Sequence, residues 1–246
     1  MAAEGGQSPL EQFVWKPIVP AEIGGVDVSF SNSSLFMTIT VVVATLFLVL
    51  GMRRSAIVPG RLQVAVRLSY EFLAGLLRDT VGSEGRKYFP IVFTLFMFVL
   101  LGNLLGMVPY SFTFTSHIVV TFAMAIVIFI FVTILGFVKH GMHFFSFFAP
   151  PGTPVVMLPL LVPIEVISYL SRPISLSVRL FANMLAGHTL IKVIAGFIPA
   201  LGVIFGVLPL ALVVALTGLE ILIAFLQAYV FAILTCLYIN DAIHLH

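Results

Sequence analysis

Charged residues are scarce in this sequence of 246 residues. Only 9% are Asp, Glu, Lys or Arg, whereas 61% are hydrophobic. Roughly a quarter of the residues of a soluble globular domain are charged, so the composition excludes that class. It indicates an integral membrane protein whose apolar side chains face hydrocarbon.

Features that mark several other classes of protein are missing. The single cysteine, Cys236, excludes an intrachain disulfide. Basic residues form no cluster interleaved with aromatic ones, which argues against binding to nucleic acid. The sequence contains no P-loop, glycine-rich phosphate cradle, nucleophile elbow or cysteine metal cluster, so we expect no cofactor and no metal. It also shows no internal repeat, which disfavours an inverted-repeat transporter.

The apolar runs predict one transmembrane domain at residues 35–246, preceded by a polar tail at 1–34. The tail is rich in Gly, Pro and Ser and has no basic region before the first apolar run, which argues against a cleaved signal peptide. The predicted elements of the domain are a span at 35–52, an amphipathic helix at 61–80, spans at 88–108 and 117–138, and two long helical blocks at 155–198 and 201–241.

The distribution of basic residues predicts the orientation of the chain. Arg53 and Arg54 follow the first span, and Lys139 and His140 follow the third. Basic residues collect on the cytoplasmic side of membrane proteins. This favours an odd number of crossings, with the N-terminus outside and the C-terminus inside. The polar stripe of the helix at 61–80 suits a helix lying on that same basic membrane face.

Both long blocks exceed the roughly 20 residues that one perpendicular span needs. An ordinary tilt of about 40° accommodates about 26 residues. Each block is therefore either two short spans or one long, steeply inclined helix, and composition leaves both arrangements open.

Ionisable residues inside the long blocks are functional candidates, because they are costly in a bilayer. Glu165, Arg172 and Arg179 are seven residues apart, which places them within about 20° per step on one helix face. His188 lies on the opposite side of the same block, and Glu220 lies in the second block. Glu and His exchange protons, whereas Arg stays charged. A fixed cation lowers the pKa of a nearby carboxylate. The acid on the same stripe, Glu165, is too far along the helix axis, so we expect Arg179 to meet a carboxylate from another subunit.

Other interpretations of these residues remain open. A buried arginine such as Arg172 often only snorkels or caps backbone carbonyls. His188 can be a packing residue, and Glu220 a neutral acid bonded to backbone. A proton-coupled secondary transporter and a purely structural anchor are the alternative functions.

Three stretches carry a resemblance to a known family. They are SRPISLSVRLFANMLAGH, GLEILIAFLQAYVFAILTCLYIND and GNLLGMVPYSFTFTSH. Together they closely resemble subunit a of the F-type ATP synthase membrane sector, and the resemblance covers roughly residues 30 to 246. It implies an all-α, polytopic bundle with one interfacial amphipathic helix and a long, steeply tilted C-terminal helical hairpin.

The resemblance also implies a function. The chain would be the stationary proton-channel subunit, not an enzyme by itself, in a bacterial or mitochondrial inner membrane. Its partners would be protons, lipid, the ring of c subunits and the b-type subunits of the peripheral stalk.

The resemblance assigns roles to individual residues. Arg179 would be the essential stator arginine, facing carboxylates of the ring, with Asn183 and Gln227 as polar neighbours. Asn103, His188 and Glu220 would line a half-channel from the acidic side, and Glu165, Ser168 and Ser175 a half-channel to the opposite side. In some branches of the family the acid and the histidine at positions 188 and 220 are exchanged, so the order of proton transfer between them stays open.

Overall fold

The computed structural model of the chain describes residues 14–20, 22–23, 26–27, 29–53, 59–108, 111–148 and 157–244. The first thirteen residues of the predicted tail and the C-terminal His246 lie outside this part. The chain divides into two compact units. Unit 1 comprises Met1–Leu46, Phe98–His117 and Leu180–Gln227, and unit 2 comprises Phe47–Met97, Ile118–Arg179 and Ala228–His246.

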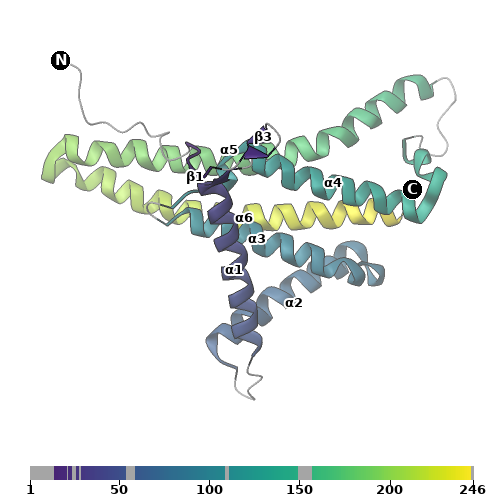
Figure 1. Cartoon of the computed structure of the whole chain (residues 1–246), viewed down its shortest axis with the longest axis horizontal. Helices are drawn as coiled ribbons and strands as arrows, with labels where there is room; N and C mark the ends of the chain where they lie inside the picture. Colours follow the sequence, from purple (N-terminus) through teal and green to yellow (C-terminus); the bar gives the residue numbers. More distant parts are fainter. Residues whose placement is uncertain are drawn as a thin grey trace. The chain divides into compact units, whose positions relative to one another are not determined.

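Helices make up most of the described chain (Figure 1). The α-helices are α1 (Asn32–Met52), α2 (Arg61–Val81), α3 (Phe89–Gly106), α4 (Ile118–His140), α5 (Leu158–Phe205) and α6 (Val207–Ile243). Short 3₁₀ segments are η2 (Ser83–Tyr88), η3 (Phe114–Ser116) and η4 (Gly141–Phe148). Within the described residues, five helical segments are long and apolar enough to cross a membrane. The predicted all-α, membrane-type class is confirmed. A helix suits this setting because it satisfies its own backbone hydrogen bonds.

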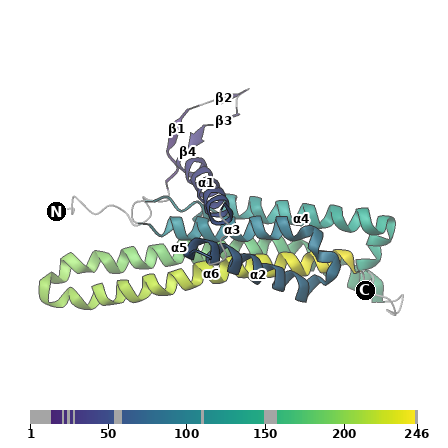
Figure 2. The same cartoon turned by 90° about the horizontal axis from the view of Figure 1, so that it is seen from below.

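Unit 1 holds the described part of the N-terminal tail, which forms two short strand pairs (Figure 2). Strand β1 (Pro17–Val19) pairs antiparallel with β4 (Phe30–Ser31), and β2 (Glu22–Ile23) pairs with β3 (Val26–Asp27). The indole Nε1 of Trp15 donates a hydrogen bond to Nδ1 of His117, 3.1 Å away. Burial lowers the pKa of the His117 imidazole, which favours the neutral ring that accepts this bond.

A helical hairpin is the longest feature of unit 1. The second part of α5 and the first part of α6 run side by side in both views (Figures 1 and 2). The turn between them depends on Gly202, whose φ of 71° is left-handed and which accepts a hydrogen bond from the amide of Gly206. The sequence prediction placed this break at residues 199–200, but Pro199 lies within α5, and the chain reverses only beyond this glycine.

Unit 2 packs α2, α4 and parts of α3, α5 and α6 around an apolar core. Leu73 of α2, Phe96 of α3 and Phe231 of α6 are at most 1% exposed. The Thr133 hydroxyl of α4 bonds the Tyr169 hydroxyl of α5 at 2.7 Å. Helix α2 buries Val66, Leu73, Leu77 and Val81 and keeps polar residues outside, which is the amphipathic pattern of the sequence. Its position on the membrane surface stays a prediction.

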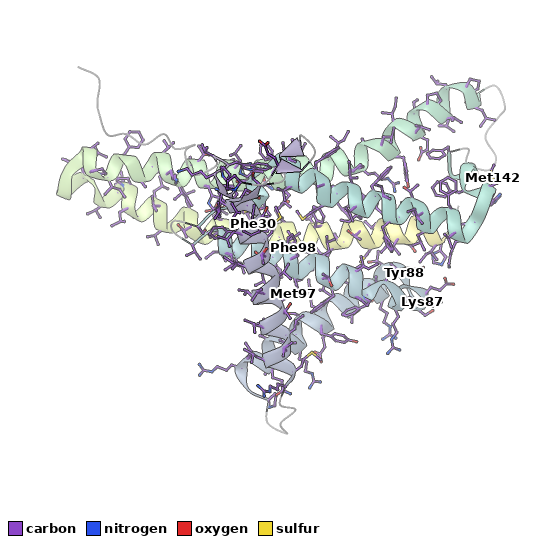
Figure 3. All side chains as sticks on the ribbon, in the orientation of Figure 1. Phe30, Lys87, Tyr88, Met97, Phe98 and Met142 are labelled. Carbon is purple, nitrogen blue, oxygen red and sulfur yellow. The ribbon has the colours of Figure 1, made fainter. Side chains whose placement is uncertain are left out.

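Large apolar side chains project outward from the helices, as the sticks of Figure 3 show. Val41 and Val49 of α1 are more than half exposed, and so is Val127 of α4. Met142 of η4, labelled in Figure 3, is 81% exposed. A soluble protein rarely leaves so much apolar surface open, so these faces suit hydrocarbon or partner subunits.

Candidate functional site

Helices α5 and α6 carry most of the predicted site residues. In unit 1, His188 of α5 and Glu220 of α6 face each other, and Nδ1 of the imidazole lies 2.9 Å from Oε1 of the carboxylate. Their side chains are only 11% and 5% exposed. Oε1 of Glu220 forms no hydrogen bond of regular geometry with the described residues. Its short polar contact is with the imidazole of His188. The structure thus brings together two residues that the resemblance assigns to the same half-channel, and their joint action stays a prediction.

The segment after α3 supplies a third member of this cluster. The Thr113 hydroxyl oxygen lies 2.9 Å from Nε2 of His188, the ring nitrogen that points away from Glu220. The same hydroxyl donates to the carbonyl oxygen of Gly106 at 2.9 Å. Thr113 is 4% exposed. The imidazole therefore has one polar partner on each of its two nitrogens.

Asn103 and Gln227 are buried in the same unit. Asn103 is fully buried in α3, and its Nδ2 donates to the carbonyl of Ala224 on α6 at 3.4 Å. Its Oδ1 is buried without a hydrogen-bond partner among the described residues. A buried amide oxygen costs free energy unless it is paired, so this oxygen is suited to a water molecule or a transient proton donor. Gln227 of α6 is 5% exposed.

Gly187 makes room for the carboxylate of Glu220. A Cβ atom built at this glycine would lie 2.7 Å from Oε1, well inside normal contact distance. His188, the next residue in the chain, lies on the same turn of α5 as this glycine. The glycine is thus required by the close approach of the two helices at this point.

In unit 2, the predicted residues of α5 have a different setting. Ser168, Ser175 and Arg179 are exposed in the isolated chain, and their spacings of seven and four put them on one helix face. Glu165 is partly exposed. Among the described residues no acid forms an ion pair with Arg179. Asn183, in the unit 1 part of α5, is also partly exposed.

The chain is similar to known proteins over nearly its whole length. The family model described as "ATP synthase A chain" matches residues 34–240. The chain is 60% identical to an ATP synthase subunit a of Rhodospirillum rubrum, over 97% of this chain and 99% of that one. It is 59% identical to one of Rhizobium etli, over 96% and 97% of the two chains, and 55% identical to one of Paramagnetospirillum magneticum, over 97% and 99%.

This chain belongs to the ATP synthase subunit a family. As a member, it is a component of a multisubunit ATP synthase, and its five apolar helical segments make it a multi-pass membrane protein. No group of three His, Cys, Asp or Glu side chains suited to a metal ion occurs in the described ranges of the chain.

Sequence reasoning about this family member missed the setting of Arg172. Its guanidinium Nη1 lies 2.9 Å from Oδ2 of Asp241 at the end of α6. The guanidinium also lies 5.4 Å and 5.0 Å from the ring centroids of Tyr169 and Tyr238. The ion pair is partly buried, with side chains 24% and 30% exposed. Arg172 thus joins α5 to α6 through an ion pair, whereas Arg179 on the same helix face is exposed.

Thr113 was also missed, although it touches the predicted His188. It lies in a segment that the sequence identifies only as a short turn, and its partner is 75 positions away. A threonine next to an apolar span gives no indication in the sequence that its hydroxyl contacts an imidazole. Only the family motif PYSFTFTS, which contains it, points to this turn.

Proposed function

We propose that this chain is the stationary proton path of an ATP synthase. Two offset half-channels load and unload the carboxylates of a rotating ring of c subunits. One runs through Asn103, His188 and Glu220, and the other along Glu165, Ser168 and Ser175. The proposed ring interface includes Arg179, with Asn183 and Gln227 as polar neighbours.

The observation that carries the proposal is the setting of Arg179. The guanidinium is permanently charged and lies within a helix apolar enough to span a membrane. Its side chain is exposed in the isolated chain and has no carboxylate partner among the described residues. A cation in such a place is costly unless a partner supplies the opposite charge. A ring carboxylate meets that need, and the arginine in turn lowers the carboxylate's pKa and releases its proton.

The small residues on the same face of α5 as Arg179 favour a partner helix that moves past this face. Ser168 and Ser175 present short side chains on the same exposed face of α5. Small residues let a second helix approach closely. Their hydroxyls also offer hydrogen bonds to water along the path of a released proton.

The rotating ring must carry several protons for each ATP molecule that is made. One elementary charge crossing 100 mV releases about 2.3 kcal/mol, which is too little to make ATP. Nucleotide chemistry therefore takes place in other subunits, and the chain is not an enzyme by itself. Partners also include the b-type subunits of the peripheral stalk, and the location is a bacterial or mitochondrial inner membrane.

Substitution of Arg179 tests the proposal. Whole complexes carrying Arg179→Ala or Arg179→Lys, reconstituted in liposomes, should lose ATP synthesis driven by a proton gradient. The lysine variant should fail because an ammonium group can lose its proton, whereas a guanidinium cannot. Arg67→Ala is the matched control, since Arg67 pairs with Glu71 on the exposed side of α2 and should keep normal synthesis.

Two outcomes would contradict the proposal. Arg179→Ala complexes that still synthesise ATP would remove the arginine from the mechanism. Coupled proton transport by this chain in liposomes without the ring would instead favour a secondary transporter.

A further inference from the structure

The hydroxyl of Thr113 has one proton but two close polar neighbours in unit 1. One neighbour is the carbonyl oxygen of Gly106, which can only accept, and the other is Nε2 of His188. Both distances are 2.9 Å. A contact this short between two electronegative atoms is favourable only when a proton lies between them.

For a neutral imidazole, only one distribution of protons satisfies both contacts. If the threonine hydroxyl donates to Nε2, its oxygen faces the Gly106 carbonyl oxygen with no proton between them. If it donates to Gly106, its lone pairs accept a proton carried by Nε2 of His188. The second arrangement gives each contact one proton, and Thr113 then fixes the tautomer of the imidazole.

We propose that Thr113 is a positioning residue that holds the proton of neutral His188 on Nε2, and so leaves Nδ1 as the exchanging nitrogen opposite Glu220. This inference rests on the proposed function, because it refines the half-channel that contains this pair. The assignment has a direct chemical consequence for the two atoms that lie 2.9 Å apart, Nδ1 and Oε1.

Nδ1 of His188 and Oε1 of Glu220 then share a single proton. When that proton is on the carboxyl group, Oε1 donates to the lone pair of Nδ1. When the Oε1–H bond breaks and an Nδ1–H bond forms, the result is an imidazolium beside a carboxylate. With no proton, the nitrogen lone pair faces a carboxylate oxygen, and with two protons, both atoms are donors. Both of those states are repulsive, so the pair passes protons one at a time.

The opposite tautomer would interrupt this exchange. A neutral imidazole with its proton on Nδ1 would donate to the Glu220 carboxylate and would leave Nε2 as the acceptor. Before it could release a proton toward Glu220, the imidazole would then have to collect a second proton on Nε2. The neighbour of Nε2 is Thr113, whose hydroxyl is itself hydrogen-bonded to backbone. The threonine thus decides which nitrogen exchanges.

Two substitutions and a control in the same segment test the assignment in the whole complex. Thr113→Val keeps the shape of the side chain and removes the hydroxyl, whereas Thr113→Ser keeps the hydroxyl. Thr115→Val is the control, because Thr115 is fully buried in the same segment and its hydroxyl has no hydrogen-bond partner among the described residues.

The first measurement is solid-state NMR of the complex labelled with nitrogen-15 histidine. The His188 signals are identified by subtracting the spectrum of a His188→Gln complex. We expect neutral His188 to carry its proton on Nε2 in the native complex, and on Nδ1 in Thr113→Val. An Nδ1 proton in the native complex, or an unchanged Nε2 proton in the valine variant, would overturn the proposal.

The second measurement is ATP-driven proton pumping into vesicles. Thr113→Val should pump about tenfold more slowly, as expected for one lost hydrogen bond, whereas Thr113→Ser should recover most of the rate and Thr115→Val should match the native complex. If His188→Gln and Glu220→Gln both pump normally, the proposed half-channel is wrong. If they fail while Thr113→Val pumps normally, only the role of Thr113 is wrong.

Discussion

At the scale of single residues, the buried and the exposed polar groups of the chain have different chemistry. His188 and Glu220 are of residue types that can exchange protons, and their buried side chains lie in contact. Arg179 cannot exchange a proton in the working pH range and is exposed in the isolated chain. A buried pair keeps its geometry because each partner compensates the desolvation of the other. An exposed permanent charge is available to a group outside the chain.

Gly187 is the residue on which the distance between the buried pair depends most directly. In Gly187→Ala, the new methyl carbon would lie 2.7 Å from Oε1 of Glu220, so the carboxylate must move away. Losing the close approach to His188 should slow ATP-driven proton pumping about tenfold, an effect of the size expected for one lost polar contact. The rate is measured in vesicles from the quenching of a pH-sensitive dye.

Gly196→Ala is the matched control for this substitution. Gly196 is on the same helix and in the same unit, and a Cβ there would meet no atom within 4 Å. Both changes raise helix propensity by about 1 kcal/mol, so a general effect on α5 would appear in both variants. Equal pumping rates for the two variants would show that the fit at Gly187 does not matter.

At the scale of elements, two polar contacts join α5 to α6. His188 contacts Glu220 in unit 1, and Arg172 contacts Asp241 in unit 2. The sequence midpoints of the two pairs fall between residues 204 and 207, close to the turn that begins at Gly202. This is the register of an antiparallel hairpin.

This register explains which parts of the site could be predicted from the sequence. Helices α1, α3 and α4 follow from local apolar runs, whereas the grouping of Glu165 with Arg179 by their spacing stays a prediction. Asp241 could not be assigned to Arg172 because the predicted turn at residues 199–200 shifts the expected partner by more than ten positions. Thr113 could not be found because its contact joins a turn to a helix far away in the chain.

The Arg172–Asp241 ion pair should stabilise unit 2. Arg172→Ala leaves the carboxylate of Asp241, which is only 30% exposed, without its partner and removes two cation–π contacts. We expect a loss of about 2 kcal/mol, which lowers the melting temperature by about 4 to 8 °C in a chain of this size. The native Cys236 reports unfolding, because it is fully buried and reacts with a thiol-specific dye only when α6 opens.

A double variant separates the effect of the ion pair on stability from the effect of side-chain size. Arg172→Asp combined with Asp241→Arg restores opposite charges and should recover part of the melting temperature that Arg172→Asp alone loses. The purified chain in detergent is sufficient for this comparison. Additive losses in the double variant would indicate that the two charges do not interact.

At the scale of the whole molecule, the described residues hold five helical segments that are long and apolar enough to span a membrane. If each of them crosses once, the two ends of the chain lie on opposite sides. Basic residues mark one side, since Arg53 follows α1, Arg86 and Lys87 precede α3, and Lys139 ends α4. By the positive-inside rule this side is the cytoplasm or its equivalent. The C-terminus should therefore be inside and the N-terminal strands outside.

Two single cysteines test this topology in the assembled complex. Lys16 and His244 are exposed residues near the two ends of the described chain, and neither lies within a span. With a membrane-impermeant maleimide, Lys16→Cys should react only in right-side-out vesicles and His244→Cys only in inside-out vesicles. The chain with only its native Cys236 is the control, because this buried thiol should react in neither preparation. Labelling of both engineered cysteines from the same side would require an even number of crossings. In that case the long α5 and α6 helices could not each cross the bilayer once, and the half-channels built on them would need a different arrangement.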